Sequence, residues 1–163
     1  MILSTHAVVG AALASLMPSQ PIAAFAAGFA SHFVIDAIPH WDYPLRSISV
    51  APGAQNDKRL TPALLRDLTV IGFDALAGLA LAIAIFATPA TLVATLAGAV
   101  GAMLPDPLRF VHAHYPYEPL ASLQRFHRWI HTKRRLGWQI GVSSQIAFAS
   151  AVAIAALAVR WAN

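Results

Sequence analysis

Three side chains that can bind a metal ion lie close together at the end of an apolar segment. His32, Asp36 and His40 are spaced four residues apart in the stretch SHFVIDAIPHWDY, which follows the uncharged run IAAFAAGFA. On a helix, residues four apart lie along one side, so the two imidazoles and the carboxylate can converge on one cation. Helical zinc motifs use ligands at this spacing. Pro39 predicts that the helix loosens just before His40. The alternative is a membrane helix that ends here and places its polar residues among lipid headgroups.

Further candidate ligands come from three other segments of the chain. His6 lies about one turn into the first apolar segment, and Asp106 follows another apolar segment in the sequence MLPDP. His127 and His131 form a second pair four residues apart, in FHRWIHT. Each has a plain structural explanation as well: a hydrogen bond between helices for His6, a turn for Asp106, and an interfacial amphipathic helix for the histidine pair.

Asp74 lies between apolar residues in VIGFDALAG. A charge at the centre of a bilayer costs roughly 2.5–3.5 kcal/mol on insertion scales, so an acid inside a membrane helix predicts a functional site. The alternative is a neutral carboxyl group that is hydrogen-bonded to a neighbouring helix. Asp67 lies two helical turns earlier on the same face, and an ion pair with Arg66 would explain it equally well.

The composition predicts an all-α integral membrane bundle, with residues 1–163 as one domain. Hydrophobic residues make up 58% of the 163 residues and charged residues only 11%, and the mean hydropathy is +0.62. Such values are typical of bilayer-embedded chains rather than soluble domains. Because the chain has no cysteine, disulfides, thiolate zinc sites and cysteine nucleophiles are excluded. It also lacks a G-x-S-x-G motif, a phosphate-binding P-loop and a dinucleotide fingerprint.

Five apolar segments predict about five transmembrane helices, and a sixth segment predicts a short amphipathic interfacial helix. The first segment lacks a basic start, so we interpret it as a retained helix rather than a signal peptide. A polar loop is expected over residues 39–61, and a loop rich in Pro, His and Tyr is expected from residue 108 to residue 119. The expected transmembrane helices cover about 3–17, 22–38, 62–87, 90–104 and 137–161, with the amphipathic helix at about 120–131.

An alternating path through the bilayer gathers the polar residues at one side. That side receives the N-terminus, every histidine, every acid and every basic residue except Arg160. The two turns on the other side, PSQP and TP, carry no charge. By the positive-inside rule the charged side is cytoplasmic. We therefore expect the N-terminus and the candidate site on the cytoplasmic side.

Histidine and carboxylate ligands without cysteine suit zinc, manganese or iron, and zinc is our first expectation, as one or two ions. Bridging carboxylates would permit a two-metal site that activates water and clamps a phosphoryl group. His40, Asp74 and Arg128 are then candidates for proton transfer, orientation or substrate contact. The expected metal ligands are His6, His32, Asp36, Asp106, His127 and His131.

These motifs resemble the small bacterial inner-membrane proteins described as membrane-bound metal-dependent hydrolases, the YdjM-like group. The string HFVIDAIPH is similar, more weakly, to the His-Asp-His signature of zinc-dependent phospholipase C. The chain departs from the YdjM-like pattern after Asp106, where Pro107 and Leu108 replace an acid and a histidine. The matching motifs are Thr5-His6, Ser31-His32 with Asp36, Leu104-Pro105-Asp106, and His127-Arg128 with His131-Thr132. The resemblance implies a metal hydrolase in the bacterial inner (plasma) membrane, with phosphoester or lipid substrates.

The expected function is therefore hydrolysis of a phosphoester in a lipid or lipid-linked substrate at the cytoplasmic interface. Arg109, Arg125 and Arg128 are candidates to hold its phosphate through paired hydrogen bonds. A divalent metal-ion transporter is one alternative, although the far halves of the helices offer only Ser and Thr. A metal-free structural or regulatory membrane protein is another. No nucleic-acid partner is expected, since a few basic residues beside a membrane helix are what topology requires.

Overall fold

The computed structural model describes residues 1–49 and 59–162, and every regular element in them is a helix. Outside the helices, the backbones of His40 and Arg135 form an isolated parallel β-bridge. The prediction of an all-α fold is thus confirmed. The helices are α1 (Leu3–Ala14), α2 (Pro21–Asp36), α3 (Pro62–Phe86), α4 (Leu92–Met103), α5 (Pro105–His114), α6 (Leu120–Ile130) and α7 (Trp138–Ala162).

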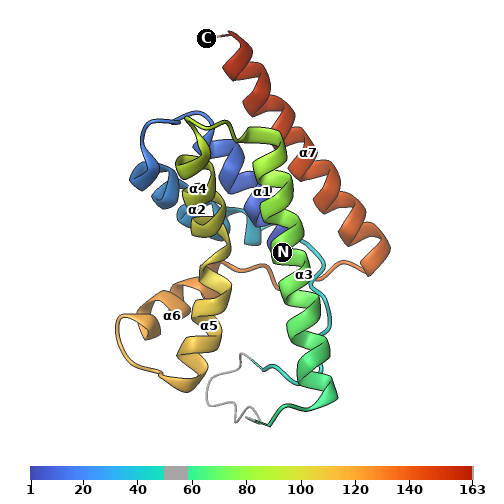
Figure 1. Cartoon of the computed structure of the whole chain (residues 1–163). Helices are drawn as coiled ribbons and strands as arrows, with labels where there is room; N and C mark the ends of the chain where they lie inside the picture. The colour runs from blue at the N-terminus through green and yellow to red at the C-terminus, as the bar shows by residue number, and fades with distance from the viewer. Residues whose placement is uncertain (50–58, 163) are drawn as a thin grey trace.

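Helix α1 is the centre of the bundle. It packs against α2, α3, α4 and α7, and nearly all of its residues are buried. Figure 1 shows α2 and α4 on one side of α1, α3 and α7 on the other, and α5 and α6 beyond one end of the bundle. The core is built largely from alanine, with Leu3, Val8, Phe86 and Met103 filling the remaining space.

Glycine brings three of these helices into backbone contact. A Cβ atom at Gly98 would overlap the carbonyl oxygen of Gly10, and one at Gly28 would overlap the carbonyl oxygen of Gly98. Side chains of any size would therefore separate α1, α2 and α4. Small residues allow such close approach where lipid supplies no hydrophobic drive between helices.

The expectation of five membrane-spanning helices is wrong. Within the described residues only α3 and α7, with 25 residues each, are long and apolar enough to cross a membrane. At 1.5 Å per residue each is roughly 37 Å long, which exceeds a hydrocarbon core of about 30 Å. Helices α1, α2 and α4 have 12, 16 and 12 residues and are too short. Their short length had predicted tilt, local thinning of the bilayer or burial among the other helices, and α1 is buried in this last way.

Residues 105–114 form helix α5, where a loop was predicted. Pro105 begins the helix, a position at which its missing N–H costs nothing. Asp106 therefore lies in the first turn of α5, where the helix dipole favours a carboxylate, and not only after the end of α4. The amphipathic helix predicted at 120–131 is confirmed as α6.

Asp67 organises the described part of the polar loop that was predicted at 39–61. Its Oδ2 atom accepts hydrogen bonds from the backbone N–H groups of Arg46, Ser47 and Ile48 at 2.8, 2.7 and 3.2 Å. Its Oδ1 atom accepts one from Arg66 at 2.9 Å. The predicted structural explanation for Asp67 is correct. Pro52, Gly53 and Lys58 of the same loop lie outside the described residues.

The glycine contacts yield a matched pair of variants. Gly98→Ala should lower the melting temperature of the detergent-purified protein, because overpacking of a tight interface costs about 1–3 kcal/mol. Gly72→Ala, in α3, has no neighbour within 4 Å of the added methyl group. It should leave stability unchanged or raise it by up to about 1 kcal/mol, through helix propensity. Equal melting temperatures for Gly98→Ala and wild type would contradict the close packing.

Candidate metal centre

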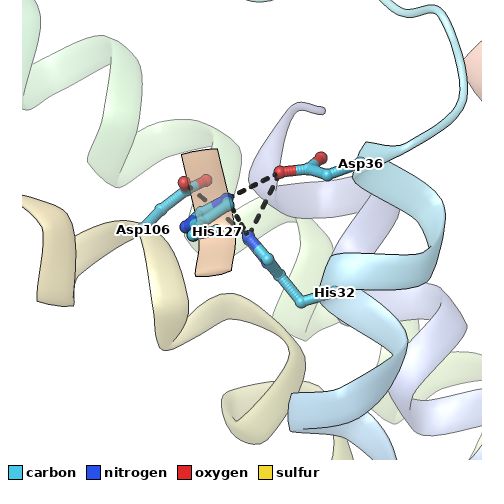
Figure 2. Close-up of side chains that lie close together, drawn as sticks. All are labelled: His32, Asp36, Asp106 and His127. Atoms are coloured by element: carbon cyan, nitrogen blue, oxygen red, sulfur yellow. Dashed lines mark hydrogen bonds and ion pairs between the residues drawn. The ribbon is translucent and has the colours of Figure 1, made fainter. Parts of the chain in front are cut away.

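The candidate site lies where α2, α5 and α6 meet at one end of the bundle. Helix α2 supplies His32 and Asp36 from its last two turns, α5 supplies Asp106 from its first turn, and α6 supplies His127. Figure 2 shows these four side chains pointing toward one another. Their ligand atoms all lie within 4.8 Å of one another, and all but Asp106 are fully buried. The four residues form the first group.

Three atoms of the first group have the spacing of ligands on one ion. His32 Nε2 lies 3.3 Å from His127 Nε2, and each of these nitrogens lies 3.2 Å from Asp36 Oδ2. Tetrahedral zinc with bonds of 2.0–2.1 Å places neighbouring ligand atoms about 3.3–3.4 Å apart. The three atoms therefore fit one face of such a site. Asp106 Oδ1, 3.8 Å from His32 Nε2, approaches as a fourth ligand.

A second group shares the same carboxylate. His40 Nε2 lies 3.9 Å from Asp36 Oδ1, and His131 Nε2 lies 3.6 Å from Asp36 Oδ2. These three residues again have ligand atoms within 4.8 Å of one another. Asp42 Oδ1 lies 3.2 Å from His40 Nε2 and adds a further carboxylate. Asp36 is therefore placed to bridge two adjacent cation positions.

Backbone carbonyl groups fix the orientation of three of the imidazole rings. The Nδ1 atoms of His32, His40 and His131 lie 2.8, 2.8 and 2.9 Å from the carbonyl oxygens of Ala102, Ile38 and Thr132. A carbonyl oxygen only accepts, so each Nδ1 carries the proton and each Nε2 presents its lone pair to the site. Ligating histidines in metalloproteins are held in this way.

The two groups suit a cation because the lone pairs of their nitrogen and oxygen atoms face one another. His40 Nε2 is buried without a hydrogen-bond partner among the described residues, and both ring nitrogens of His6 share this condition. Buried lone pairs that lack a donor are costly. Part of the negative charge is met by the amino group of Met1, 2.5 Å from Asp36 Oδ1. A divalent ion held by the second group would satisfy the lone pair of His40 Nε2.

The surroundings of His127, His131 and Asp42 favour the protonation states in which these side chains can bind a metal ion. Burial lowers the pKa of His127 and the pKa of His131, so both rings stay neutral near pH 7. Burial acts to raise the pKa of Asp42, but the nearby His40 ring, the positive amino group of Met1 and the ring of His131 together outweigh it and lower that pKa overall. Neutral imidazole and ionised carboxylate are the forms that bind metal.

A basic cavity of about 360 Å³ opens beside the second group. Arg109, Arg128, Lys133 and Arg135 line it, together with His127 and His131. Arg109 Nη1 lies 3.7 Å from Asp106 Oδ1, which is a loose ion pair. The guanidinium of Arg109 thus retains hydrogen-bond donors that can face the cavity. This surface suits an anionic group beside the candidate metal positions.

The structure brings most of the predicted site residues together. Five of the six expected ligands belong to the two groups, and His40, which was expected to act in catalysis, belongs to the second. The five are His32, Asp36, Asp106, His127 and His131. His6 lies outside both groups, but its ring stacks on His32 with centroids 4.0 Å apart and its Nε2 lies 3.3 Å from Asp36 Oδ1.

Asp74 and Arg128 lie outside both groups. Asp74 Oδ2 accepts a hydrogen bond of 3.2 Å from the N–H of Ser4, one of the unpaired donors in the first turn of α1. Arg128 is exposed on α6 and reaches the site only through the basic cavity. The catalytic roles expected for both residues stay predictions.

Sequence reasoning missed Asp42 and Gln145. Asp42 lies two residues after His40, and residues two apart do not share a helix face, so periodicity did not predict it as a ligand. The one sequence signal for it is its place among His40 and other acids and histidines. Gln145, buried in α7, accepts from the N–H of Ile2 and donates to the carbonyl oxygen of Trp41, each at 2.9 Å. A glutamine within an apolar helix is a signal of such a tie.

Removal of a central ligand should remove the metal. We expect His32→Ala and Asp36→Asn to lose nearly all bound metal, because each takes away one corner of the three-atom face. His114→Ala is the matched control, since His114 is half-buried, belongs to neither group and bonds within α5 to the carbonyl oxygen of Phe110. Elemental analysis of tag-free, detergent-purified protein measures the content, and size-exclusion profiles check the fold. A full metal complement in Asp36→Asn would refute the site.

Metal content should fall with decreasing pH. Metal and proton compete for the imidazole nitrogens, which titrate near pH 6.5 in the absence of perturbation. Because burial lowers the pKa of His127 and His131, protons displace the metal only below that value. We expect retention at about pH 7 and release toward about pH 5. Dialysis of metal-loaded protein at each pH, with reloading at neutral pH as the control, measures this; undiminished content at the lowest pH would contradict it.

Comparison of the chain with protein-family models, with curated proteins and with solved structures finds no match. The resemblance to the YdjM-like hydrolases therefore stays a prediction from short motifs. The chemistry open to this site follows from its own side chains.

Proposed function

We propose that the protein is a membrane-bound, metal-dependent hydrolase of phosphoesters, with zinc as its first candidate metal. The observation that carries the proposal is the arrangement around Asp36, which faces two histidines of the first group and two of the second. Carboxylates shared between adjacent metal positions are typical of two-metal phosphatases and nucleases. A divalent ion held there would supply Lewis acidity toward a phosphoryl oxygen and would lower the pKa of water.

The basic cavity favours a phosphate among the possible substrates. Four cationic side chains line it, against one carboxylate from Asp42. Arginine guanidinium groups bind phosphate oxygens through pairs of parallel hydrogen bonds. Arg109 and Arg128 would orient the phosphoester toward His127 and His131, which line the same cavity. Substrate binding and the metal ligands thus share one surface.

The two long helices, α3 and α7, support a location in the membrane. In the proposed orientation α3 and α7 cross the bilayer, and the site lies at the end of the bundle where most charges gather. The turns at the opposite end, residues 18–21 and 88–89, carry none. The positive-inside rule would make the site cytoplasmic.

A one-sided site favours an enzyme over a metal-ion transporter. A transporter needs polar groups that continue beyond the binding site toward the other side of the membrane. In the described residues the end of α1 packs instead against α2 and α4 through an apolar cluster of Ala14, Ala24 and Ala94, with Met17 beside it. In that direction the described parts of α1, α2 and α4 offer hydroxyl groups, such as those of Ser15 and Thr95, but no carboxylate or imidazole.

The proposal predicts chelator-sensitive phosphodiesterase activity. Purified protein loaded with zinc or manganese should hydrolyse bis(p-nitrophenyl) phosphate, and chelation should abolish the rate until metal is restored. We expect His127→Ala to lower the rate by about 100-fold or more, since even the partners that orient metal ligands contribute 10–100-fold. His114→Ala should match wild type. Metal-loaded protein with no activity on phosphomonoesters or phosphodiesters would refute the proposal.

A further inference from the structure

A second cavity, of about 690 Å³, lies between the first half of α3, the start of α5 and the segment that follows His40. Its walls are largely apolar, with Leu45, Leu68, Ile71, Phe110 and Val111 among the lining residues. Cavities of about 300–1,000 Å³ hold small-molecule ligands. The main function proposed above does not use these walls.

The apolar cavity and the basic cavity meet at common residues. Arg109, His131, Arg135 and Asp42 line both of them. Asp106, a member of the first group, also lines the apolar cavity. One elongated ligand could therefore lie in both cavities, with its anionic end on the arginines beside the metal positions and its apolar end between α3 and α5.

Two observations favour a lipid as the occupant. Leu68 is 49% exposed on α3, one of the two helices able to span a membrane, so the apolar cavity borders the surface that would face lipid. The opposite end carries the positive charge that complements a phosphate. A soluble phosphoester would use the basic end and would gain nothing from the apolar walls.

Hydrogen bonds within the chain hold the wall that the loop forms. Arg66 donates a hydrogen bond of 3.1 Å to the carbonyl oxygen of Pro44, and Asp67 holds the three N–H groups that follow Leu45. Pro44 and Leu45 both line the cavity. Preorganised walls lower the entropy cost of binding a flexible chain.

We propose that this cavity binds the hydrocarbon chain of a phospholipid-like substrate whose phosphate lies between Arg109 and Arg135 at the metal centre. This inference rests on the proposed function and names the substrate class of the same site. Arg109 and Arg135 would hold the phosphate, Leu68 and Phe110 would contact the chain, and hydrolysis would follow at the end next to His131.

Binding of non-hydrolysable phosphonates to the metal-loaded protein tests the inference. The protein is placed in phosphatidylcholine nanodiscs, and titration calorimetry measures dodecylphosphonate and methylphosphonate, with empty nanodiscs subtracted. We expect dodecylphosphonate to bind about 100-fold more tightly, because several buried methylene groups each contribute severalfold. Dodecyltrimethylammonium, with the same chain and the opposite charge, should bind no better than it does to empty nanodiscs.

Two tryptophan variants of α3 separate the cavity from the lipid-facing surface. Leu68→Trp fills the apolar cavity and should reduce the preference for dodecylphosphonate from about 100-fold to nearly none. Leu76→Trp, at a residue that is 68% exposed and outside the cavity lining, should keep the preference. Elemental analysis should find the same metal content in both. Equal affinities for the two phosphonates in wild type, or an unchanged preference in Leu68→Trp, would overturn the inference.

The failure of this inference and the failure of the proposed function give different results. Protein that holds metal and hydrolyses bis(p-nitrophenyl) phosphate, but binds both phosphonates equally, would keep the proposed function and overturn the lipid substrate. Protein that holds no metal and hydrolyses no phosphoester would overturn the proposed function. Chain-dependent binding that Leu68→Trp removes would support the cavity in either case.

Discussion

The site depends on a single buried carboxylate. Asp36 is fully buried at the last residue of α2, and its side chain lies within 4 Å of ring nitrogens from His6, His32, His40, His127 and His131. A buried charge persists only with compensating partners. The backbone also closes around this position: the N–H of Thr132 donates to the carbonyl oxygen of Asp36, and that of Leu136 to the carbonyl oxygen of His40. The segment after α6 is thereby fixed against the ligands.

The depth of that carboxylate is set by the packing of short helices. Because glycine lets α4 contact both α1 and α2, the carbonyl oxygen of Ala102 comes within 2.8 Å of His32 Nδ1. A wider separation of these helices would remove the group that orients the ring. The same close packing buries nearly all of the 12 residues of α1. The orientation of His32 therefore depends on the absence of side chains where α1, α2 and α4 cross.

Local periodicity predicted the parts of the site that lie on one helix face. The spacing of His32 with Asp36, and the prediction of α6, needed no tertiary information. The cost of burying an acid predicted a functional site at Asp74, and that role stays a prediction. The cost of burial does not reveal whether the partner of the acid is a metal ion or a hydrogen-bond donor. For Asp67 the partners are three backbone N–H groups and the side chain of Arg66. Asp42 and the helical conformation of α5 were missed because contacts between distant segments determine them. Hydropathy likewise predicted apolar burial but not whether lipid or protein covers each helix.

Helix α5 joins the three environments of the site. Asp106, Arg109 and Phe110 lie three and four residues apart, so they share one side of this short helix. Asp106 approaches the first metal group, Arg109 lines both cavities, and Phe110 lines the apolar one. A rigid helix keeps these three groups at fixed separations, whereas a loop would let them vary. The same ten residues thus relate the position of an anionic group to the metal ligands and to the apolar wall. An amphiphilic ligand is the one chemical form that would engage all three together.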